Sequence, residues 1–147
     1  MANQEQLAIL KQGVDVWNNW RADNPDVEID LRAAKLAESN LNRANLNRAN
    51  LSGADLSHAH LTHANLSLAN LRLASFRDSH LVRAHLNGAD ISHAHLNRAD
   101  LTATDLKSAI FSSADLSGAN LTAADLRGAN LTGADLKGAT LIHTKVQ

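Results

Sequence analysis

Residues 44–58 read ANLNRANLSGADLSH, which is three copies of a five-residue unit in which Leu follows Ala by two positions. The same spacing runs from Leu31 to Val146, so that every fifth residue in this range is large and apolar. Of these 24 positions 20 are Leu, and the exceptions are Phe76, Ile91, Phe111 and Val146. An unbroken repeat of this length must determine the architecture of most of the chain.

A five-residue period fits neither common secondary structure. In an α-helix, five residues advance about 500°, so successive leucines would spread around the circumference instead of forming one stripe. In a continuous strand, side chains alternate with period two, so leucines five apart would lie on opposite faces. The pattern becomes consistent when Ala and Leu both point inward from a short extended segment and the next residues turn a corner. The sequence therefore predicts a coil.

The units at residues 44–48, 54–58, 119–123 and 124–128 resemble the pentapeptide-repeat family, and the resemblance extends over residues 31–146. It implies an all-β fold, namely a right-handed quadrilateral parallel β-helix, or solenoid, with four units per coil. The 24 units would then make about six coils. Coils of this kind bury a core only by stacking on their neighbours.

The first 30 residues follow a different pattern. Asn3 can cap a helix over residues 4–22, with Gln6 three residues later, and Pro25 ends it because proline cannot continue the hydrogen-bond ladder. Alternation over residues 27–31 then predicts a strand that leads into the first coil. The helix itself is indicated by apolar residues at the spacing of one helical face, which are Leu7, Leu10, Val14 and Trp17.

We therefore expect one structural domain, made of an N-terminal helical cap with its leading strand, residues 1–30, and a β-helix, residues 31–147. The open end of a β-helix exposes unpaired backbone groups and the apolar bore, so a cap is physically useful. The alternative is that the helix docks on a partner. The segment also resembles those preceding the repeats in bacterial, particularly cyanobacterial, members of the family.

The C-terminal end offers no comparable cap, because only six residues follow Leu141. Either this end pairs with another molecule, or Lys145 and the terminal carboxylate blunt the last coil. We therefore expect a monomer or a C-terminal end-to-end dimer. Because no signal peptide or membrane span is recognisable, we expect a cytoplasmic protein with no membrane association.

Charge argues against a nucleic-acid partner. The chain carries 14 Lys and Arg against 15 Asp and Glu, a net charge of −1. With four units per coil, residues 20 apart stack in columns, and basic residues fall in several columns, such as Arg43 with Arg83 and Lys107 with Arg127. Phosphate binding needs clustered cations, which this column analysis does not produce.

Mimicry of DNA is also disfavoured. Some family members resemble duplex DNA in shape and charge and act on DNA gyrase, which requires a dominant negative surface along the rod. The richest acidic column here contains Asp55, Asp115 and Asp135 and is interrupted by Ser75 and His95. A near-neutral chain without a long acidic column does not fit that role.

Seven of the eight histidines lie between residues 58 and 95. By the 20-residue spacing, His58 and His60 lie directly below Asp78 and His80. Imidazole and carboxylate ligands in such a two-by-two array could suit Zn²⁺ or another transition metal. The competing interpretation is that these are solvated side chains with no supporting shell beneath them. We favour the second interpretation and expect no metal or other cofactor.

No catalytic constellation is present. The chain has no cysteine, and every Ser occupies a repetitive position. Glycines such as Gly118 and Gly128 occupy corner positions, where turn geometry explains them better than phosphate binding. A bore filled with Leu and Ala leaves no pocket that could raise a carboxyl pKa. We therefore expect no catalytic or cofactor-binding residues and no enzymatic activity.

Three apolar residues break the polar outer pattern and are candidates for contact with a partner. Leu68 and Leu73 occupy the fifth position of consecutive units, and Ile110 occupies the position elsewhere held by Asp or Asn. The column arithmetic places all three on or beside one side of the rod. The alternative is that they are isolated surface residues, which are ordinary in soluble proteins.

The sequence thus indicates a non-enzymatic scaffold for protein interaction or structure, with an unknown protein partner, that displays side chains on a rigid rod. Two alternatives stay open. One is a DNA-mimicking regulator of a nucleic-acid enzyme such as gyrase, which the near-neutral charge disfavours. The other is surface metal binding through the histidine cluster.

Overall fold

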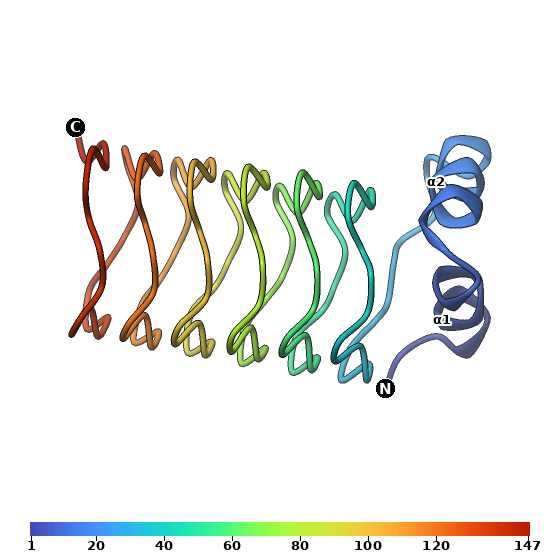
Figure 1. Ribbon diagram of the computed structural model, residues 1–147. Helices are drawn as coiled ribbons and strands as arrows, with labels where there is room; N and C mark the ends of the chain where they lie inside the picture. The colour runs from blue at the N-terminus through green and yellow to red at the C-terminus, as the bar shows by residue number, and fades with distance from the viewer.

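The computed structural model describes residues 1–147 as two short helices followed by a rod of stacked coils (Figure 1). Helix α1 spans Gln4–Lys11 and helix α2 spans Val14–Asp23. Neither helix is long and apolar enough to cross a membrane. The two ends of the chain lie at opposite ends of the rod, with both helices packed at the N-terminal end (Figure 1).

Parallel β-bridges join residues 20 apart, from Asp30 with Asn50 to Asp125 with Lys145. Because bridges recur every five residues and join residues 20 apart, each coil has four sides, as the family resemblance implies. The bridges stay isolated instead of extending into long strands, because a turn follows every inward-pointing Leu. The coils therefore form a parallel β-helix in which every side contributes one short rung.

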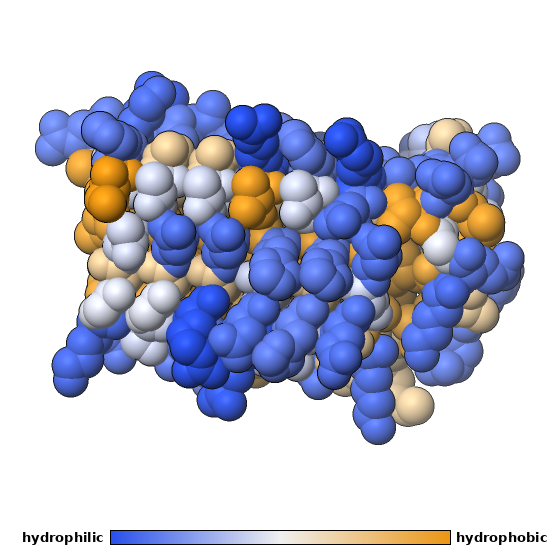
Figure 2. Space-filling model, in the orientation of Figure 1, coloured by the Kyte–Doolittle hydropathy of each residue, from blue (hydrophilic) through white to orange (hydrophobic).

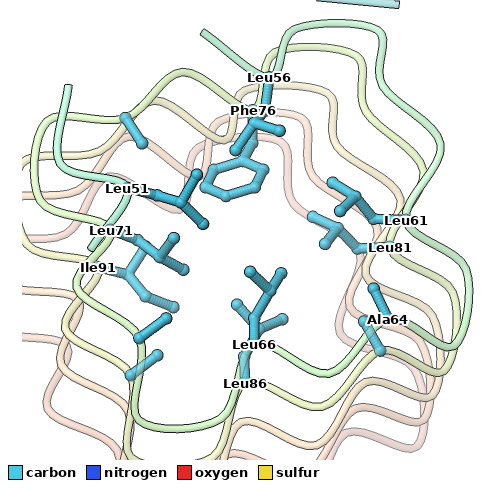
Figure 3. Close-up of a cluster of buried hydrophobic side chains, with 14 of the residues drawn as sticks. Leu51, Leu56, Leu61, Ala64, Leu66, Leu71, Phe76, Leu81, Leu86 and Ile91 are labelled. Atoms are coloured by element: carbon cyan, nitrogen blue, oxygen red, sulfur yellow. The ribbon is translucent and has the colours of Figure 1, made fainter. Parts of the chain in front are cut away.

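Inside the coil, Leu and Ala of each unit form a continuous apolar core. Figure 3 shows Leu51, Leu71 and Ile91 from successive coils stacked on one wall, with the ring of Phe76 extending into the bore. These four side chains, like that of Phe111, are fully buried. The bore is a packed core and leaves no channel.

Each corner needs one residue in the left-handed region of backbone space. Arg48 has φ of 62° and Leu68 has φ of 59°, a conformation that most side chains disfavour. The residue before the inward Leu helps to close the corner: the Asn65 side-chain oxygen accepts the Ser67 backbone N–H at 3.0 Å. This Asx turn explains why Asn and Asp prevail at a position that the sequence suggested only to be exposed.

The prediction of a single helix over residues 4–22 is wrong, because the chain breaks at Gln12 and Gly13. Gly13 has φ of 121°, which a side chain would oppose. The predicted N-cap is confirmed, since the Asn3 side chain accepts the Gln6 backbone N–H at 3.0 Å. The two short helices therefore lie at the end of the rod with a break at Gly13 between them (Figure 1).

The Gln6 side chain links α1 to the segment that leads into the first coil. It donates to the Glu28 carbonyl at 2.9 Å and accepts the Asp30 backbone N–H at 2.8 Å. The predicted alternation holds only in part here, because Ile29 is buried but Val27 is 42% exposed. A single bridge at Asp30 replaces the expected strand.

Helix α2 packs on the first coil through Trp17, which is completely buried. The Trp17 indole N–H donates to the Asn45 carbonyl at 2.8 Å, and Arg21 donates to the Asn45 and Asn47 carbonyls at 2.9 and 3.0 Å. Asn18 accepts the Asn45 backbone N–H at 2.8 Å. The side chains of α2 therefore form hydrogen bonds with backbone groups of the first coil, which has no further coil beneath it to pair with these groups.

The opposite end of the rod has no element packed on it (Figure 1). The backbone N–H of Phe111 donates to Asn130 in the next coil at 2.7 Å, whereas that of Leu131 donates to no backbone carbonyl. Leu141, Ile142 and Val146 are 48, 57 and 61% exposed. Apolar and hydrogen-bonding surface is thus accessible on the last coil.

Candidate functional site

The structure offers no deep cleft. The largest hollow, of about 640 Å³, is open and lies between the segment after α2 and the first coils. Within it Arg32 pairs with Asp30 at 2.8 Å, so these charges satisfy each other. Its lining is mainly charged: Arg21, Asp26, Glu28, Asp30, Arg32 and Arg48. Candidate functional residues must therefore lie on the outer surface.

Ion pairs within single units hold several outer charges in place. Arg127 donates to both carboxylate oxygens of Asp125, at 2.9 and 2.6 Å, and this contact lowers the pKa of Asp125 to about 2. Arg32 acts on Asp30 in the same way and lowers its pKa to about 2. A general acid needs a raised pKa, so these carboxylates suit structural roles.

Hydroxyl groups stabilise other carboxylates. Ser57 donates to Asp55 at 2.6 Å, and Ser117 donates to Asp115 at the same distance; these hydrogen bonds lower the pKa of both aspartates. The two aspartates belong to the acidic column foreseen from the sequence. Successive bridges confirm its order, which is Asp55, Ser75, His95, Asp115 and Asp135.

The histidine cluster stacks as the 20-residue spacing predicts. The rings of His60 and His80 lie parallel with centroids 4.9 Å apart, and His58 Nε2 is 3.8 Å from an Asp78 oxygen. However, Arg98 occupies Asp78 through hydrogen bonds of 2.8 and 3.0 Å, which lower the Asp78 pKa. No three His, Asp or Glu side chains are arranged to hold a metal ion, so this array does not form the hypothesised site.

The three apolar candidates are all exposed. Leu68, Leu73 and Ile110 are 51, 61 and 39% exposed. Leu68 and Leu73 lie at the two corners that flank Asn70. Ile110 lies two coils above Asn70, and Asp90 forms a β-bridge with each of these two residues. The three residues therefore lie on or beside one side of the rod, as the column arithmetic predicts, and a contact role for each residue stays a prediction.

One buried polar group escaped the sequence analysis. Asn97 is only 8% exposed, and its side-chain oxygen has no hydrogen-bond partner. Equivalent positions in other coils include Ser57 and Ser117, whose hydroxyls donate to the Asp two residues earlier. The residue two positions before Asn97 is His95. The sequence signal for this unpaired oxygen was the combination of His95 with Asn97, where the units of Ser57 and Ser117 combine Asp with Ser.

Comparison with known families decides the family of this rod. The model described as pentapeptide repeats matches overlapping segments at residues 29–67, 54–92, 69–108, 84–122 and 109–147. The chain belongs to the pentapeptide-repeat family. Its fold is accordingly a right-handed β-helix, and members of the family are generally structural or interaction proteins rather than enzymes.

A solved structure of another member agrees with the fold. A pentapeptide repeat protein, Rfr23, from the cyanobacterium Cyanothece 51142 is 27% identical with a TM-score of 0.75, over 88% of this chain and 97% of that one. HetL is a pentapeptide repeat protein involved in heterocyst differentiation regulation in the cyanobacterium Nostoc sp. strain PCC 7120. It is 36% identical to this chain with a TM-score of 0.41, and the match covers 75% of this chain and 58% of that one. No curated protein matches the chain.

Proposed function

We propose that this protein is a non-enzymatic scaffold that binds partner proteins on the outer faces of a rod of about six coils, closed at one end by its two helices. The observation that carries the proposal is the combination of a filled bore with outer side chains fixed at every corner. Arg48, for example, projects from a left-handed corner whose N–H donates to the Ser67 carbonyl of the next coil at 2.9 Å.

Such a surface suits binding better than catalysis. Binding to side chains carried on a hydrogen-bonded backbone requires no ordering of that backbone, which favours affinity. The carboxyl groups whose pKa changes all change downward, which does not suit proton transfer at neutral pH; these are Asp30, Asp55, Asp78, Asp115 and Asp125. The absence of enzymatic activity is therefore part of the proposal.

The alternative of DNA mimicry draws no support from the charges. The acidic column is interrupted at Ser75 and His95, and arginines pair with the aspartates beside them, as Arg127 does with Asp125. A DNA-like surface would need unpaired negative charge along the whole rod.

The scaffold is tested by cross-linking in the native cell, capture of the tagged full chain and reconstitution with each recovered protein after purification. We expect at least one protein to bind with defined stoichiometry in calorimetry. Recovery of no protein that binds after purification would overturn the proposal. Fractionation of the same cells tests the predicted cytoplasmic location.

Self-association through the last coil extends the same proposal. Exposed Leu141, Ile142 and Val146 and the free Leu131 amide could pair with a second copy. Sedimentation at tens of micromolar distinguishes the two expected states. A single monomeric mass would exclude the end-to-end dimer, and a dimer that survives Ile142→Asp would place the contact elsewhere.

A further inference from the structure

Charge along the rod is arranged in bands, which the column analysis did not reveal. Residues 1–38 contain four basic and seven acidic side chains, a net charge of −3. Residues 39–89 contain five arginines and two aspartates, a net charge of +3. Residues 90–147 contain five basic and six acidic side chains, a net charge of −1. A positive band therefore lies between two negative ones.

Within the positive band, one surface carries no carboxylate at all. The segments 39–48, 59–68 and 79–88 stack on one another through the 20-residue bridges, and none of them contains Asp or Glu. They form two adjacent sides of three successive coils. Figure 2 shows the most hydrophilic colour in separate spots, along the upper edge of the rod and again at its lower edge near the middle.

The arginines of this surface are unpaired. Arg43, Arg48 and Arg83 are exposed, and none of them makes an ion pair or donates a side-chain hydrogen bond. Elsewhere Arg32, Arg72, Arg98 and Arg127 lie within 4 Å of an aspartate. The three free guanidinium groups can therefore accept a partner's carboxylates without first breaking an internal pair.

The exposed apolar side chain of Leu68 lies on the same surface as these arginines. Leu68 occupies the corner column that begins with Arg48 and continues to Gly88. A β-carbon at residue 88 would lie 2.7 Å from Leu68 Cδ2, so the glycine leaves room for Leu68 to lean over the next coil. Between the two corner columns the side is lined by uncharged Asn65 and Ser67. The surface thus combines arginines in two corner columns with one exposed apolar side chain.

We propose that the surface formed by residues 39–48, 59–68 and 79–88 binds an acidic segment of a partner protein that also carries an apolar side chain. This inference rests on the proposed scaffold function and identifies the surface at which the partner binds. Arg43 and Arg83 lie two coils apart, or roughly 10 Å along the axis. Acidic residues three apart in an extended segment span roughly the same distance.

A protein segment fits this surface better than nucleic acid does. The surface has no Trp, Tyr or Phe side chain for base stacking, because Trp17, Trp20, Phe76 and Phe111 all lie outside these segments or in the bore, and the imidazole rings of His60 and His80 stack on each other. The negative bands on both sides would repel a long polyanion that followed the rod. A short acidic segment confined to the band avoids that repulsion.

Binding of labelled peptides by fluorescence anisotropy in 50 mM salt tests the inference. The probes are a nine-residue peptide with a central Leu and Glu elsewhere, the all-Glu peptide of equal length, and an oligothymidylate of equal charge. The test variant of the full chain is Arg43→Gln with Arg83→Gln. Its matched control is Lys107→Gln with Lys137→Gln, which has the same net charge but alters coils outside the positive band.

We expect the Leu-containing peptide to bind saturably and the test variant to weaken it about tenfold, as the loss of two charge contacts implies. The control should weaken binding less than twofold. Leu68→Ser should reduce the preference for the Leu-containing peptide over the all-Glu peptide. Circular dichroism verifies that each variant is folded; if the test variant fails to fold, Arg43→Lys with Arg83→Lys should retain peptide binding.

Three results would overturn the inference. They are absence of saturable binding, equal weakening by test and control variants, and tighter binding of the oligothymidylate than of either peptide. A native partner whose affinity is unchanged by Arg43→Gln with Arg83→Gln would also overturn it while leaving the scaffold function standing. Failure of the scaffold would instead appear as the lack of any reconstituted partner.

Discussion

The bore and the outer surface of the coil arise from the same five-residue unit but differ in how they vary along the rod. Inside, Leu46 and Ala44 have near-identical counterparts in every coil, and their side chains are fully buried. Outside, the column of Asn45 continues as Asn65, His85, Asp105, Asp125 and Lys145. The comparison teaches that stacking constrains the inward residues, whereas the outward ones can change chemistry without changing the fold.

The largest expected effect tests whether the bore is packed to completion. Phe76→Ala removes a fully buried ring and should lower the free energy of unfolding by about 3–5 kcal/mol, because the lost contacts leave a cavity. Phe76→Leu restores the commonest residue of the lattice and should cost less than about 1.5 kcal/mol. Chemical denaturation of both variants measures the difference. Equal stability of the two would mean that the bore is loosely filled.

The covered end provides the next test. Trp17→Phe keeps most of the buried ring but loses the hydrogen bond to the Asn45 carbonyl, which Arg21 still contacts. We expect a loss of about 1 kcal/mol, the usual net contribution of one hydrogen bond. Thermal unfolding should show it, with Trp20→Phe as the control at a less buried site. A larger loss for the control would show that Trp17 is not the main anchor of α2.

An outer position should tolerate even a change from apolar to polar. Ile110 lies where Asn65 and Asp115 form Asx turns with the backbone N–H two residues later, at 3.0 and 2.9 Å. Ile110→Asn should therefore close the corner at Ser112 and raise stability by about 0.5–1 kcal/mol. Ile110→Val, which cannot accept that hydrogen bond, serves as control in the same denaturation experiment. Loss of stability on Ile110→Asn would mean that Ile110 packs against its neighbours.

The smallest expected effect concerns the ion pair between Arg127 and Asp125 and how its contribution to stability depends on pH. Because Arg127 lowers the pKa of Asp125 to about 2 from its usual value of 3.8, unfolding takes up a proton between these pH values. The resulting stability is complete above about pH 4 and is lost as the pH falls through 2. Arg127→Gln should therefore lower the melting temperature slightly at pH 6, and the difference should close toward pH 2. A difference that persists at pH 2 would indicate packing rather than ionisation.

Several features could be predicted because they depend on spacing alone. The 20-residue register followed from the five-residue period together with the four units per coil that the family resemblance implied, and it placed His60 below His80 and Asp55 in an interrupted acidic column. The N-cap at Asn3 followed from local hydrogen-bond chemistry. Such features need only the chain geometry of a few residues or the regularity of the repeat.

Other features depended on contacts that spacing does not specify. The helical pattern continued through Gly13, so the break between α1 and α2 was missed. Spacing places Arg98 one coil above Asp78, but the two hydrogen bonds with which Arg98 engages this carboxylate beside His58 appear only in the structure. Spacing also places Ile110 on the side flanked by Leu68 and Leu73, but the exposed fraction of each side chain appears only in the structure. In each case a neighbour from another coil or element determined the outcome.

The amino-acid sequence by itself determined a coil with a Leu and Ala bore, because a five-residue apolar period fits neither a helix nor a continuous strand. Its units also carried the resemblance to the family, which implied the four sides. Only the tertiary structure decided which charges remain free. Arg98 and Arg43 occupy equivalent kinds of corner, yet Arg98 meets Asp78 and Arg43 meets no carboxylate. The 20-residue register identifies the residue about 5 Å away in the adjoining coil, but whether two charged side chains meet depends on their conformations, which the sequence does not specify.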